Sequence, residues 1–170
     1  AAVGWFPDDA HILASAIRGD GTRQILEVSV PAGESRILKS TSAPLGVVKL
    51  SPDGRYIAFD QVGEVETGNR DVFIRSVDGS REERIVDDAA NDFVLGWAPD
   101  GEHLLFASDR EGTLGAWLLR LENGEPSGEP VLVRPDGSER LYPGGDTYQE
   151  EVTGWYLTWS PDGERLVFTS

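Results

Sequence analysis

The feature that most constrains the fold of this chain is a tight-turn motif that recurs four times with similar apolar flanks. Proline presets φ for the first central position of a type I turn, aspartate can bond its own backbone two residues on, and glycine accepts a positive φ. In the first copy aspartate replaces glycine, and aspartate is among the few residues that tolerate this conformation. Each motif therefore predicts a hairpin between two antiparallel strands. The four copies are Trp5-Phe6-Pro7-Asp8-Asp9, Leu50-Ser51-Pro52-Asp53-Gly54, Trp97-Ala98-Pro99-Asp100-Gly101 and Trp159-Ser160-Pro161-Asp162-Gly163.

The residues around each turn predict strands that are covered on both faces. A large apolar residue stands two positions before each proline, and three consecutive apolar residues follow five to seven positions after it. In the third copy these three residues are Leu104, Leu105 and Phe106. Because side chains alternate between the two faces of a strand, a strand that is apolar on both faces lies between two other layers.

The spacing of the repeats predicts a β-propeller. Pro7, Pro52, Pro99 and Pro161 are 45, 47 and 62 residues apart, and a period of about 40–50 residues in a chain of short strands is typical of four-stranded propeller blades. We therefore predict an all-β chain, a β-propeller of four-stranded antiparallel blades with about three and a half blades in a partial ring. The expected strands are residues 2–5, 11–16, 24–30, 35–39, 46–50, 56–60, 71–77, 83–86, 93–97, 103–108, 115–121, 131–134, 154–159 and 165–169.

We expect residues 1–170 to form a single partial propeller domain. Its repeats cover about residues 2–44, 45–91 and 92–150, and the incomplete fourth repeat covers 152–170. The third repeat is longer because of an insertion at 135–151, and a long insertion in a compact repeat protein is either a functional loop or a disordered one. The partial ring is expected either to be an arc of a longer ring or to close by pairing two chains. An open arc exposes the apolar face of an end sheet, which predicts that the isolated chain self-associates or is unstable.

The repeat also resembles that of a known family. Trp-Ser-Pro-Asp-Gly, an apolar strand and an Asp-Arg-x-Gly loop are similar to the repeat of TolB-type propellers, and related repeats occur in tricorn protease and in peptidases of the prolyl-oligopeptidase type. The best match runs from Trp97 to Leu121 and includes Ser108-Asp109-Arg110-Glu111-Gly112. The resemblance covers nearly the whole chain and implies a propeller fold, with a structural role for Asp109 and Arg110. It also suggests a periplasmic or envelope location in a bacterium.

Composition narrows the class of partner. The chain has 30 acidic and 15 basic residues and a net charge of −15. This charge disfavours a nucleic-acid partner and an anionic membrane surface, and it suits basic protein or peptide partners. The chain has no cysteine, which excludes disulfides and thiol chemistry. No apolar run is long enough for direct membrane insertion.

The residues best suited to binding lie in loops at one end of the predicted blades, opposite the Pro-Asp-Gly turns. The loops that join the second and third strands, and those that join one blade to the next, converge there. Their acidic side chains would form a negative mouth that attracts a basic peptide, and a tyrosine in the insertion would add an aromatic anchor. The candidate binding residues are Asp20, Glu64, Glu66, Asp87, Asp88, Asp92, Asp109, Glu111, Asp146, Tyr148, Glu150 and Glu151.

No catalytic or metal site is predicted. His11 and His103 each lie four residues after a motif proline, and we expect them at exposed strand starts rather than in a zinc site. The sequence has no nucleophile elbow, metalloprotease helix or phosphate loop. Calcium is a further candidate ligand for residues 87–92 because hard cations prefer clustered oxygen atoms, although the spacing matches no known calcium loop. No other cofactor is expected.

The function that these features favour is a non-catalytic scaffold that binds a protein or peptide through its acidic loops. Two alternatives from other classes stay open. One is the substrate-gating propeller of a serine peptidase resembling prolyl oligopeptidase or tricorn, with the nucleophile outside these residues. The other is the sensory propeller of a kinase or a transcription regulator.

Overall fold

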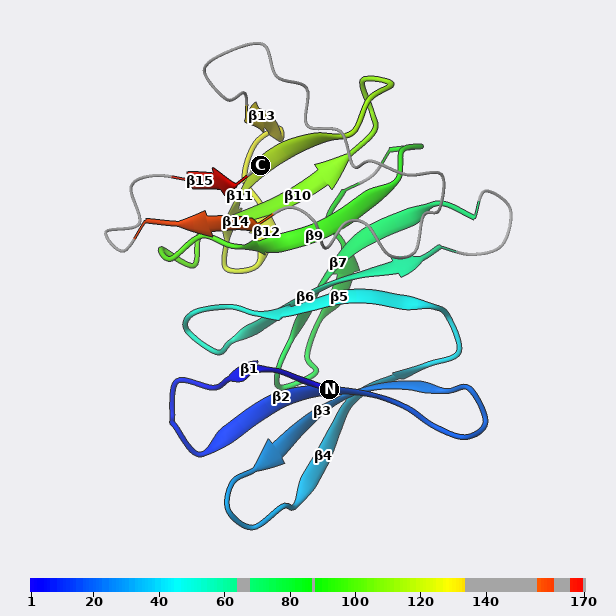
Figure 1. Ribbon diagram of the computed structural model, residues 1–170, viewed down its shortest axis with the longest axis vertical. Coiled ribbons are helices and arrows are strands. Elements are labelled where there is room, and N and C mark those ends of the chain that lie inside the picture. The colour runs from blue at the N-terminus through cyan, green and yellow to red at the C-terminus, as the bar shows by residue number, and fades with distance from the viewer. Residues whose placement is uncertain (64–67, 87, 134–155, 161–165, 170) are drawn as a thin grey trace.

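The computed structural model describes residues 1–63, 68–86, 88–133, 156–160 and 166–169. These residues form antiparallel sheets that stack on one another along the long axis of the molecule, with no helix among them (Figure 1). The predicted all-β partial propeller is therefore confirmed. The strands are β1 (Ala2–Trp5), β2 (His11–Ile17), β3 (Arg23–Ser29), β4 (Ser35–Thr41), β5 (Leu45–Leu50), β6 (Tyr56–Val62), β7 (Arg70–Ser76), β8 (Glu82–Arg84), β9 (Asp92–Trp97), β10 (His103–Ser108), β11 (Gly115–Glu122), β12 (Glu125–Pro126), β13 (Val131–Val133), β14 (Tyr156–Trp159) and β15 (Leu166–Thr169).

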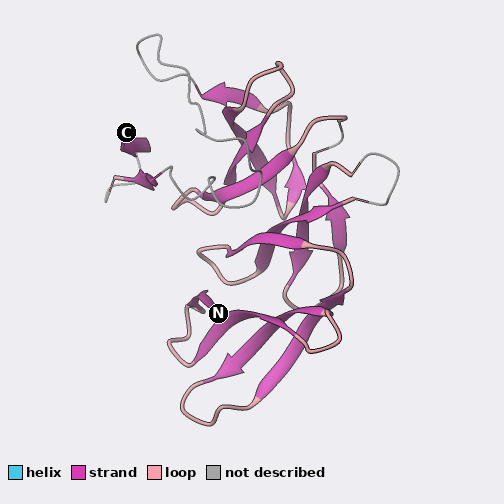
Figure 2. Cartoon of the chain, turned by 45° about the vertical axis from the view of Figure 1, so that its right-hand side comes forward, coloured by secondary structure: helices cyan, strands magenta, loops and turns pink. Residues whose placement is uncertain are grey.

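Each sheet is a simple antiparallel meander. Blade 1 has the strand order β1-β2-β3-β4 and blade 2 the order β5-β6-β7-β8. Blade 3 has the order β12-β11-β10-β9, with β13 also paired to β11, and β14 pairs with β15 in a two-stranded sheet. Figure 2 shows blades 1 to 3 as successive layers, each turned relative to the one before.

The three described Pro-Asp-Gly-type turns adopt the conformation that the sequence predicts. Gly54 and Gly101 have φ of 72° and 71°, and Asp9, which replaces glycine in the first copy, has φ of 55°. In each copy the turn aspartate accepts a hydrogen bond from the backbone N–H two residues on. The N···O distances are 2.9 Å at Asp8, 3.0 Å at Asp53 and 2.8 Å at Asp100.

The turns also pack on one another from blade to blade. A Cβ added at Gly54 would lie 2.7 Å from Cδ of Pro7, and one added at Gly101 would lie 3.8 Å from Cδ of Pro52. Each turn glycine therefore lies next to the turn proline of the preceding blade. At Gly54 the contact leaves no room for a side chain, so both the positive φ and the close approach require glycine there.

The second strand of each inner blade is buried on both faces, as predicted. In blade 2, Ile57, Ala58 and Phe59 each have no solvent-exposed surface. Ile57 and Phe59 pack in the hydrophobic cluster shared with blade 1, which includes Leu13 and Ile25. Ala58 packs in the cluster shared with blade 3. The core is thus a series of layers between sheets, and each sheet depends on its neighbours for burial.

The outer strands depart most from the predicted ranges. β8 ends at Arg84, two residues before the predicted end, although Val86 remains 3% exposed. In blade 3 the outer strand is divided into β12 and β13, whereas the sequence predicted a single outer strand at residues 131–134. Asn123 and Gly124 have φ of 53° and 77°. Because both φ values are positive, they allow a tight two-residue turn in which β12 pairs at once with β11.

A buried carboxylate ties blade 2 to blade 3. Oδ1 of Asp60 accepts hydrogen bonds from the N–H of Val47 at 3.0 Å and of Val94 at 3.2 Å, while Oδ2 accepts one from Arg70 at 2.8 Å. Burial raises the pKa of Asp60, and these three donors act against that rise. The position is possible because residue 46 is glycine: a Cβ there would lie 1.9 Å from Oδ2 of Asp60.

We expect the substitution Gly46→Ala to lower the free energy of unfolding by at least about 2 kcal/mol, because it displaces a buried carboxylate from its donors. The measurement is chemical denaturation of both proteins. Gly96→Ala in β9 is the matched control, since a Cβ there meets no atom within 4 Å, and it should change the free energy of unfolding by less than about 1 kcal/mol. Equal losses in the two variants would contradict the role assigned to Asp60.

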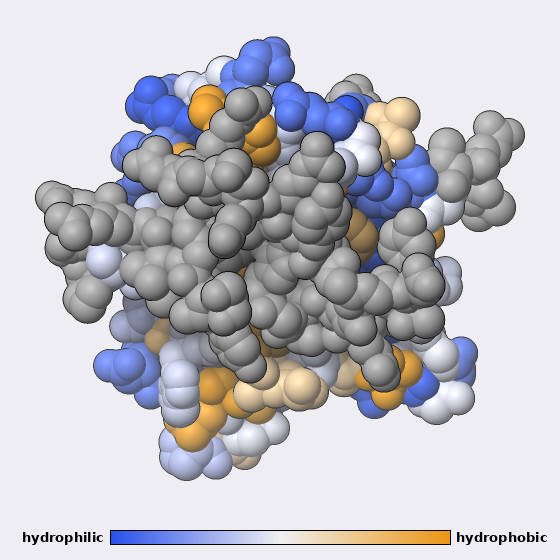
Figure 3. Space-filling model, turned by 45° about the horizontal axis from the view of Figure 1, so that its top comes forward, coloured by the Kyte–Doolittle hydropathy of each residue, from blue (hydrophilic) through white to orange (hydrophobic). Residues whose placement is uncertain are grey.

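One apolar face of blade 1 is not covered by the described residues. The strand register places Trp5, Ile12 and Val28 on one face, together with Leu26 and Ile37. We call this set the Trp5 face. Trp5 is 58% exposed and Ile37 is 52% exposed. Figure 3 views the molecule with the opposite end brought forward, and there apolar residues lie interspersed with polar ones in the lower part of the view.

The equivalent face of blade 3 shows what such a surface packs against. Trp97, Leu104 and Leu119 hold the corresponding register positions and belong to the cluster shared with blade 2. Trp97 is 9% exposed and its Nε1 donates to the carbonyl of Lys49 at 3.3 Å. Full burial of one large apolar side chain contributes about 1.5–3 kcal/mol of favourable free energy. A sheet that covered the Trp5 face would therefore be stabilised by several such contributions.

We therefore predict that this chain self-associates through the Trp5 face. Light scattering coupled to size-exclusion chromatography should show a concentration-dependent dimer or larger species, and the double substitution of Trp5→Ser with Ile37→Ser should shift it toward monomer. Ile17→Ser is the control, because Ile17 is 72% exposed but lies on the other face of the sheet. A wild-type chain that stays monomeric at high concentration would refute the prediction.

Candidate functional site

The candidate site is the end of the blades opposite the Pro-Asp-Gly turns, which we call the loop end. The antiparallel order places there the loops after β2, β6 and β10, together with the connections from β4 to β5 and from β8 to β9. Hydrogen bonds link the β6–β7 loop, the β8–β9 connection and the β10–β11 loop. The loop end of blades 2 and 3 is thus one connected surface.

The structure describes five of the twelve predicted binding residues. Asp88 and Asp92 both pair with Arg110, Asp109 accepts hydrogen bonds from Asn91, and Asp20 and Glu111 are exposed. Asp20 accepts a hydrogen bond from the N–H of Thr22 at 2.9 Å, which lowers the pKa of its carboxyl. The predicted residues that lie outside the described part of the chain are Glu64, Glu66, Asp87, Asp146, Tyr148, Glu150 and Glu151.

Arg110 is the centre of the contacts in this region. Its Nη2 lies 2.8 Å from Oδ2 of Asp88 and 3.3 Å from Oδ1 of Asp92. Its Nε donates to Oγ of Ser108 at 2.9 Å. The guanidinium carbon lies 4.8 Å from the ring centroid of Trp117, a cation–π geometry. Arg110 therefore joins the β10–β11 loop to the β8–β9 connection, which agrees with the structural role implied by the family resemblance.

Asp92 is a fully buried carboxylate at the loop end. The residue has no exposed surface, and its Oδ2 has no hydrogen-bond partner. Burial is the main cause that raises the pKa of Asp92, and the nearby charge of Asp88 raises it further. Hydrogen bonds from Ser108 and Arg110 favour the ionised form and limit the rise. Asp92 is thus placed to hold Arg110 rather than to meet a ligand from solvent.

A second set of polar contacts holds the β8–β9 connection between its neighbours. Asp109 accepts from the N–H of Asn91 at 2.8 Å and from its side-chain Nδ2 at 3.1 Å. Oδ1 of Asn91 in turn accepts from the N–H of Arg70 at 3.3 Å, and Nδ2 of Asn69 donates to the carbonyl of Ala89. These bonds give the loop end a defined shape, since each loop is fixed by side chains of another.

The calcium hypothesis for residues 87–92 gains no support from this geometry. Asp88 and Asp92 share the guanidinium of Arg110, which lies where a cation between them would bind. In the part of the chain that the structure describes, no group of three or more His, Cys, Asp or Glu side chains is placed to hold a metal ion.

The two histidines lie at the opposite end of the blades, at strand starts as expected. His11 begins β2 and His103 begins β10. Nδ1 of His11 is 2.6 Å from Oδ2 of Asp8, and Nδ1 of His103 is 2.8 Å from Oδ2 of Asp100. Sequence reasoning missed these pairs, although the Asp-x-x-His spacing within the turn could have revealed them. Each pair links the first residue of a strand to the aspartate of the preceding turn, which stabilises the turn.

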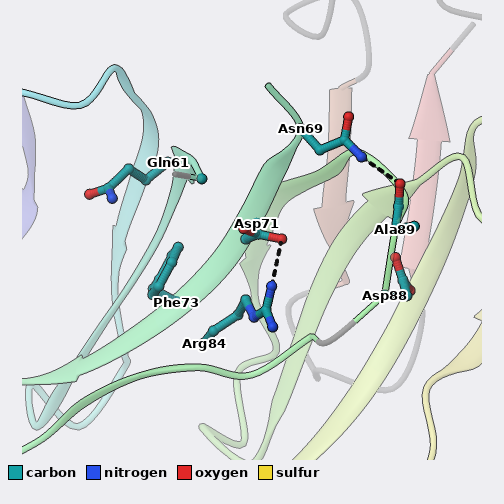
Figure 4. A pocket seen from close by; sticks show the side chains of 8 residues that line it. Gln61, Asn69, Asp71, Phe73, Arg84, Asp88 and Ala89 are labelled. Atoms are coloured by element: carbon teal, nitrogen blue, oxygen red, sulfur yellow. Dashed lines mark hydrogen bonds and ion pairs between the residues drawn. The ribbon is translucent and has the colours of Figure 1, made fainter. Parts of the chain in front are cut away.

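A pocket of about 640 Å³ opens at the loop end of blade 2. Its lining comes from three adjacent strands and from the loops beside them, and in the strands Gln61 pairs with Asp71 and Phe73 pairs with Arg84. Figure 4 shows Asp71 and Arg84 pointing toward one another, with Phe73 and Gln61 on one side and Asp88 on the other. The separation between Nη1 of Arg84 and Oδ1 of Asp71 is 3.6 Å. Sequence reasoning missed this pocket because its residues meet only through strand pairing.

The comparisons with known proteins agree with this architecture. The crystal structure of TolB from Acinetobacter baumannii superposes with a TM-score of 0.71 at 20% identity, over 97% of this chain and 36% of that chain. The fold of this chain is that of a TolB-type β-propeller. The propeller domain of the trilobed protease from Pyrococcus furiosus is also similar, with a TM-score of 0.54 and 19% identity over 78% of this chain and 41% of that chain.

A sequence relative of this chain is found in Agrobacterium fabrum. It is the uncharacterized protein Atu1656, which is 33% identical over 174 residues, and the match includes 97% of this chain. This chain spans 53% of the length of that relative. No protein-family model matches the sequence. The described residues contain no helix long and apolar enough to cross a membrane.

We predict that Arg110→Ala lowers the free energy of unfolding by about 3 kcal/mol or more, because it leaves two partly or fully buried carboxylates without their cation. Arg120→Ala is the matched control: Arg120 is 53% exposed and pairs with Glu122 on the surface, so its loss should cost less than about 1 kcal/mol. Denaturant unfolding measures both. If Arg110→Ala proves no more damaging than the control, Arg110 does not hold the loop end together.

Proposed function

We propose that this chain is part of a non-catalytic β-propeller that binds a basic protein or peptide at its loop end. The observation that carries the proposal is the order of that surface: loops from blades 2 and 3 are held together by Arg110 and Asn91. A surface ordered before binding loses less conformational entropy when a partner arrives. That the partner is basic is inferred from the negative net charge of the chain.

The charge of the chain supports a basic partner. The net charge is −15, and the described loops add the exposed carboxylates of Asp20 and Glu111 to the loop end. Charges of one sign that gather on a surface attract partners of the other sign and speed their association. The carboxylates around Arg110 are already compensated, so the attraction would come from the exposed ones.

The proposal that this segment is not itself an enzyme rests on the use of its polar side chains. Both histidines are paired with turn aspartates, and Asp92 and Asp109 are engaged in contacts between loops. These groups serve the fold. The likeness to a protease propeller is a likeness of fold, and it does not favour a peptidase partner over any other class.

The test measures binding of a labelled arginine-rich peptide by fluorescence anisotropy between about 0.01 and 1 M NaCl, where the Debye length falls from about 30 to about 3 Å. We expect the Kd to weaken at least about tenfold over this range. Binding that does not change with salt, or no binding at low salt, would refute the proposal.

Paired variants test whether the loop end is the surface used. Asp20→Asn with Glu111→Gln removes two exposed charges from the loop end and should weaken peptide binding several-fold. Glu102→Gln with Glu122→Gln removes two exposed charges near the Pro-Asp-Gly turns, at the opposite end, and should have little effect. Equal effects of the two double variants would indicate attraction by net charge alone.

A further inference from the structure

The pocket of blade 2 begins where the apolar contact with blade 1 ends. Phe59 and Phe73 stack with ring centroids 5.4 Å apart and planes 9° apart, and both contribute to the hydrophobic cluster between blades 1 and 2. Gln61 and Asp71 are the next residues toward the loop end on the same face of the sheet, since Phe59 pairs with Phe73 and Gln61 with Asp71. The pocket therefore has an aromatic side, formed by Phe73, and a polar side (Figure 4).

The charged side chains of the described lining are already compensated. Nη1 of Arg84 lies 3.6 Å from Oδ1 of Asp71. Oδ2 of Asp88 lies 2.8 Å from Nη2 of Arg110, and its Oδ1 accepts a hydrogen bond from the N–H of Ala90 at 2.8 Å. A charged ligand would therefore find no counter-ion among these residues and would lose its hydration without compensation. The charge balance favours a neutral ligand.

The polar side presents hydrogen-bonding groups of both kinds. Oε1 of Gln61 is a buried acceptor with no hydrogen-bond partner, and a buried acceptor without a donor is unfavourable. A ligand that donates to this oxygen removes the penalty. Beside it, the carboxylate of Asp71 accepts and the guanidinium of Arg84 donates. Each of these two groups has several positions for hydrogen bonds, so it can serve a ligand as well as a protein partner.

The size of the pocket suits a small molecule. Its volume of about 640 Å³ lies in the range of about 300–1,000 Å³ that is common for ligand sites. Its aromatic side and several of its polar groups come from β6, β7 and β8, which are paired in one sheet. These side chains are therefore positioned before a ligand arrives, which lowers the entropy that binding costs.

We propose that this pocket binds a neutral sugar, a ligand class distinct from the basic peptide of the proposed function. A hydroxyl group both donates and accepts hydrogen bonds. The hydroxyls of one sugar ring can thus donate to Gln61 and Asp71 and accept from Arg84, while the C–H face of the ring packs on Phe73. An apolar ligand of the same size would leave Gln61 unsatisfied, and a charged ligand would meet no counter-ion in the described lining.

Gly63 leaves the space that the carboxylate of Asp71 needs. A Cβ at residue 63 would lie 2.7 Å from Oδ2 of Asp71, so a side chain there would displace or crowd this carboxylate. The substitution Gly63→Ala is therefore a second way to disturb the polar side of the pocket.

The first experiment compares sugars that differ mainly in charge. The probes are D-glucose, D-galactose and D-mannose, with the 2-amino and the 6-carboxylate derivative of each. Calorimetry measures binding at about pH 6, where the amines are charged. We expect at least one neutral hexose to bind with a Kd of about 1 mM or below, and its two charged derivatives to bind at least about tenfold more weakly. Binding by none of the hexoses, or equal binding of a charged derivative, would overturn the proposal.

The second experiment makes the same substitution at two glutamines. Gln61→Met removes the acceptor at nearly the same side-chain length. It should weaken binding of that hexose at least about tenfold without lowering the free energy of unfolding, since the acceptor has no partner to lose. Gln24→Met is the matched control, because Oε1 of Gln24 accepts from Nε of Arg18 at 2.7 Å in blade 1. It should lower the free energy of unfolding and leave hexose binding unchanged.

The variants also separate this site from the proposed function. Unchanged hexose affinity in Gln61→Met, or an equal loss in both glutamine variants, would contradict the proposal. If Gln61→Met fails to fold, Gly63→Ala decides, and it should weaken hexose binding several-fold. The arginine-rich peptide should bind Gln61→Met as it binds the wild-type chain. A parallel loss of peptide binding would overturn the assignment of the pocket to a different ligand class.

Discussion

The rest of the structure depends on one packing constraint: each sheet is apolar on both faces and must be covered on both. Ile57 and Phe59 fill the layer toward blade 1, and Ala58 between them fills the layer toward blade 3. A sheet of this kind cannot be stable alone, because one face would remain in water. Stacking of successive blades is the direct solution, and the packing of each turn glycine beside the preceding turn proline follows from it.

Stacked sheets bring loops of different blades to fixed distances, and polar side chains make use of this. Asp60 accepts hydrogen bonds from backbone N–H groups of both β5 and β9, and Arg110 joins the β10–β11 loop to Asp88 of the β8–β9 connection and to Asp92 at the start of β9. Several acidic residues of a strongly acidic chain are therefore structural. The charges left for a partner are the ones that the fold does not use, such as those of Asp20 and Glu111.

The pocket at the loop end of blade 2 has the same origin. Blade 1 covers the aromatic part of the face of blade 2 but not its polar end, where Gln61, Asp71 and Arg84 lie on adjacent strands. The sheet supplies a rigid floor and the loops supply the rim. Side chains that strands hold are positioned more firmly than side chains on loops.

The sequence by itself determined the features that depend on neighbours in the chain. The Pro-Asp-Gly turns, the positive φ at Asp9, the two-faced strands and the stacking into blades all follow from local conformation and period-2 alternation. Only the tertiary structure decided that Asp92 is buried against Arg110 and that Gln61 lines a pocket with Arg84. Burial and ion pairing depend on residues that strand register and sheet stacking bring together. The sequence around a carboxylate therefore does not show whether another strand will cover it.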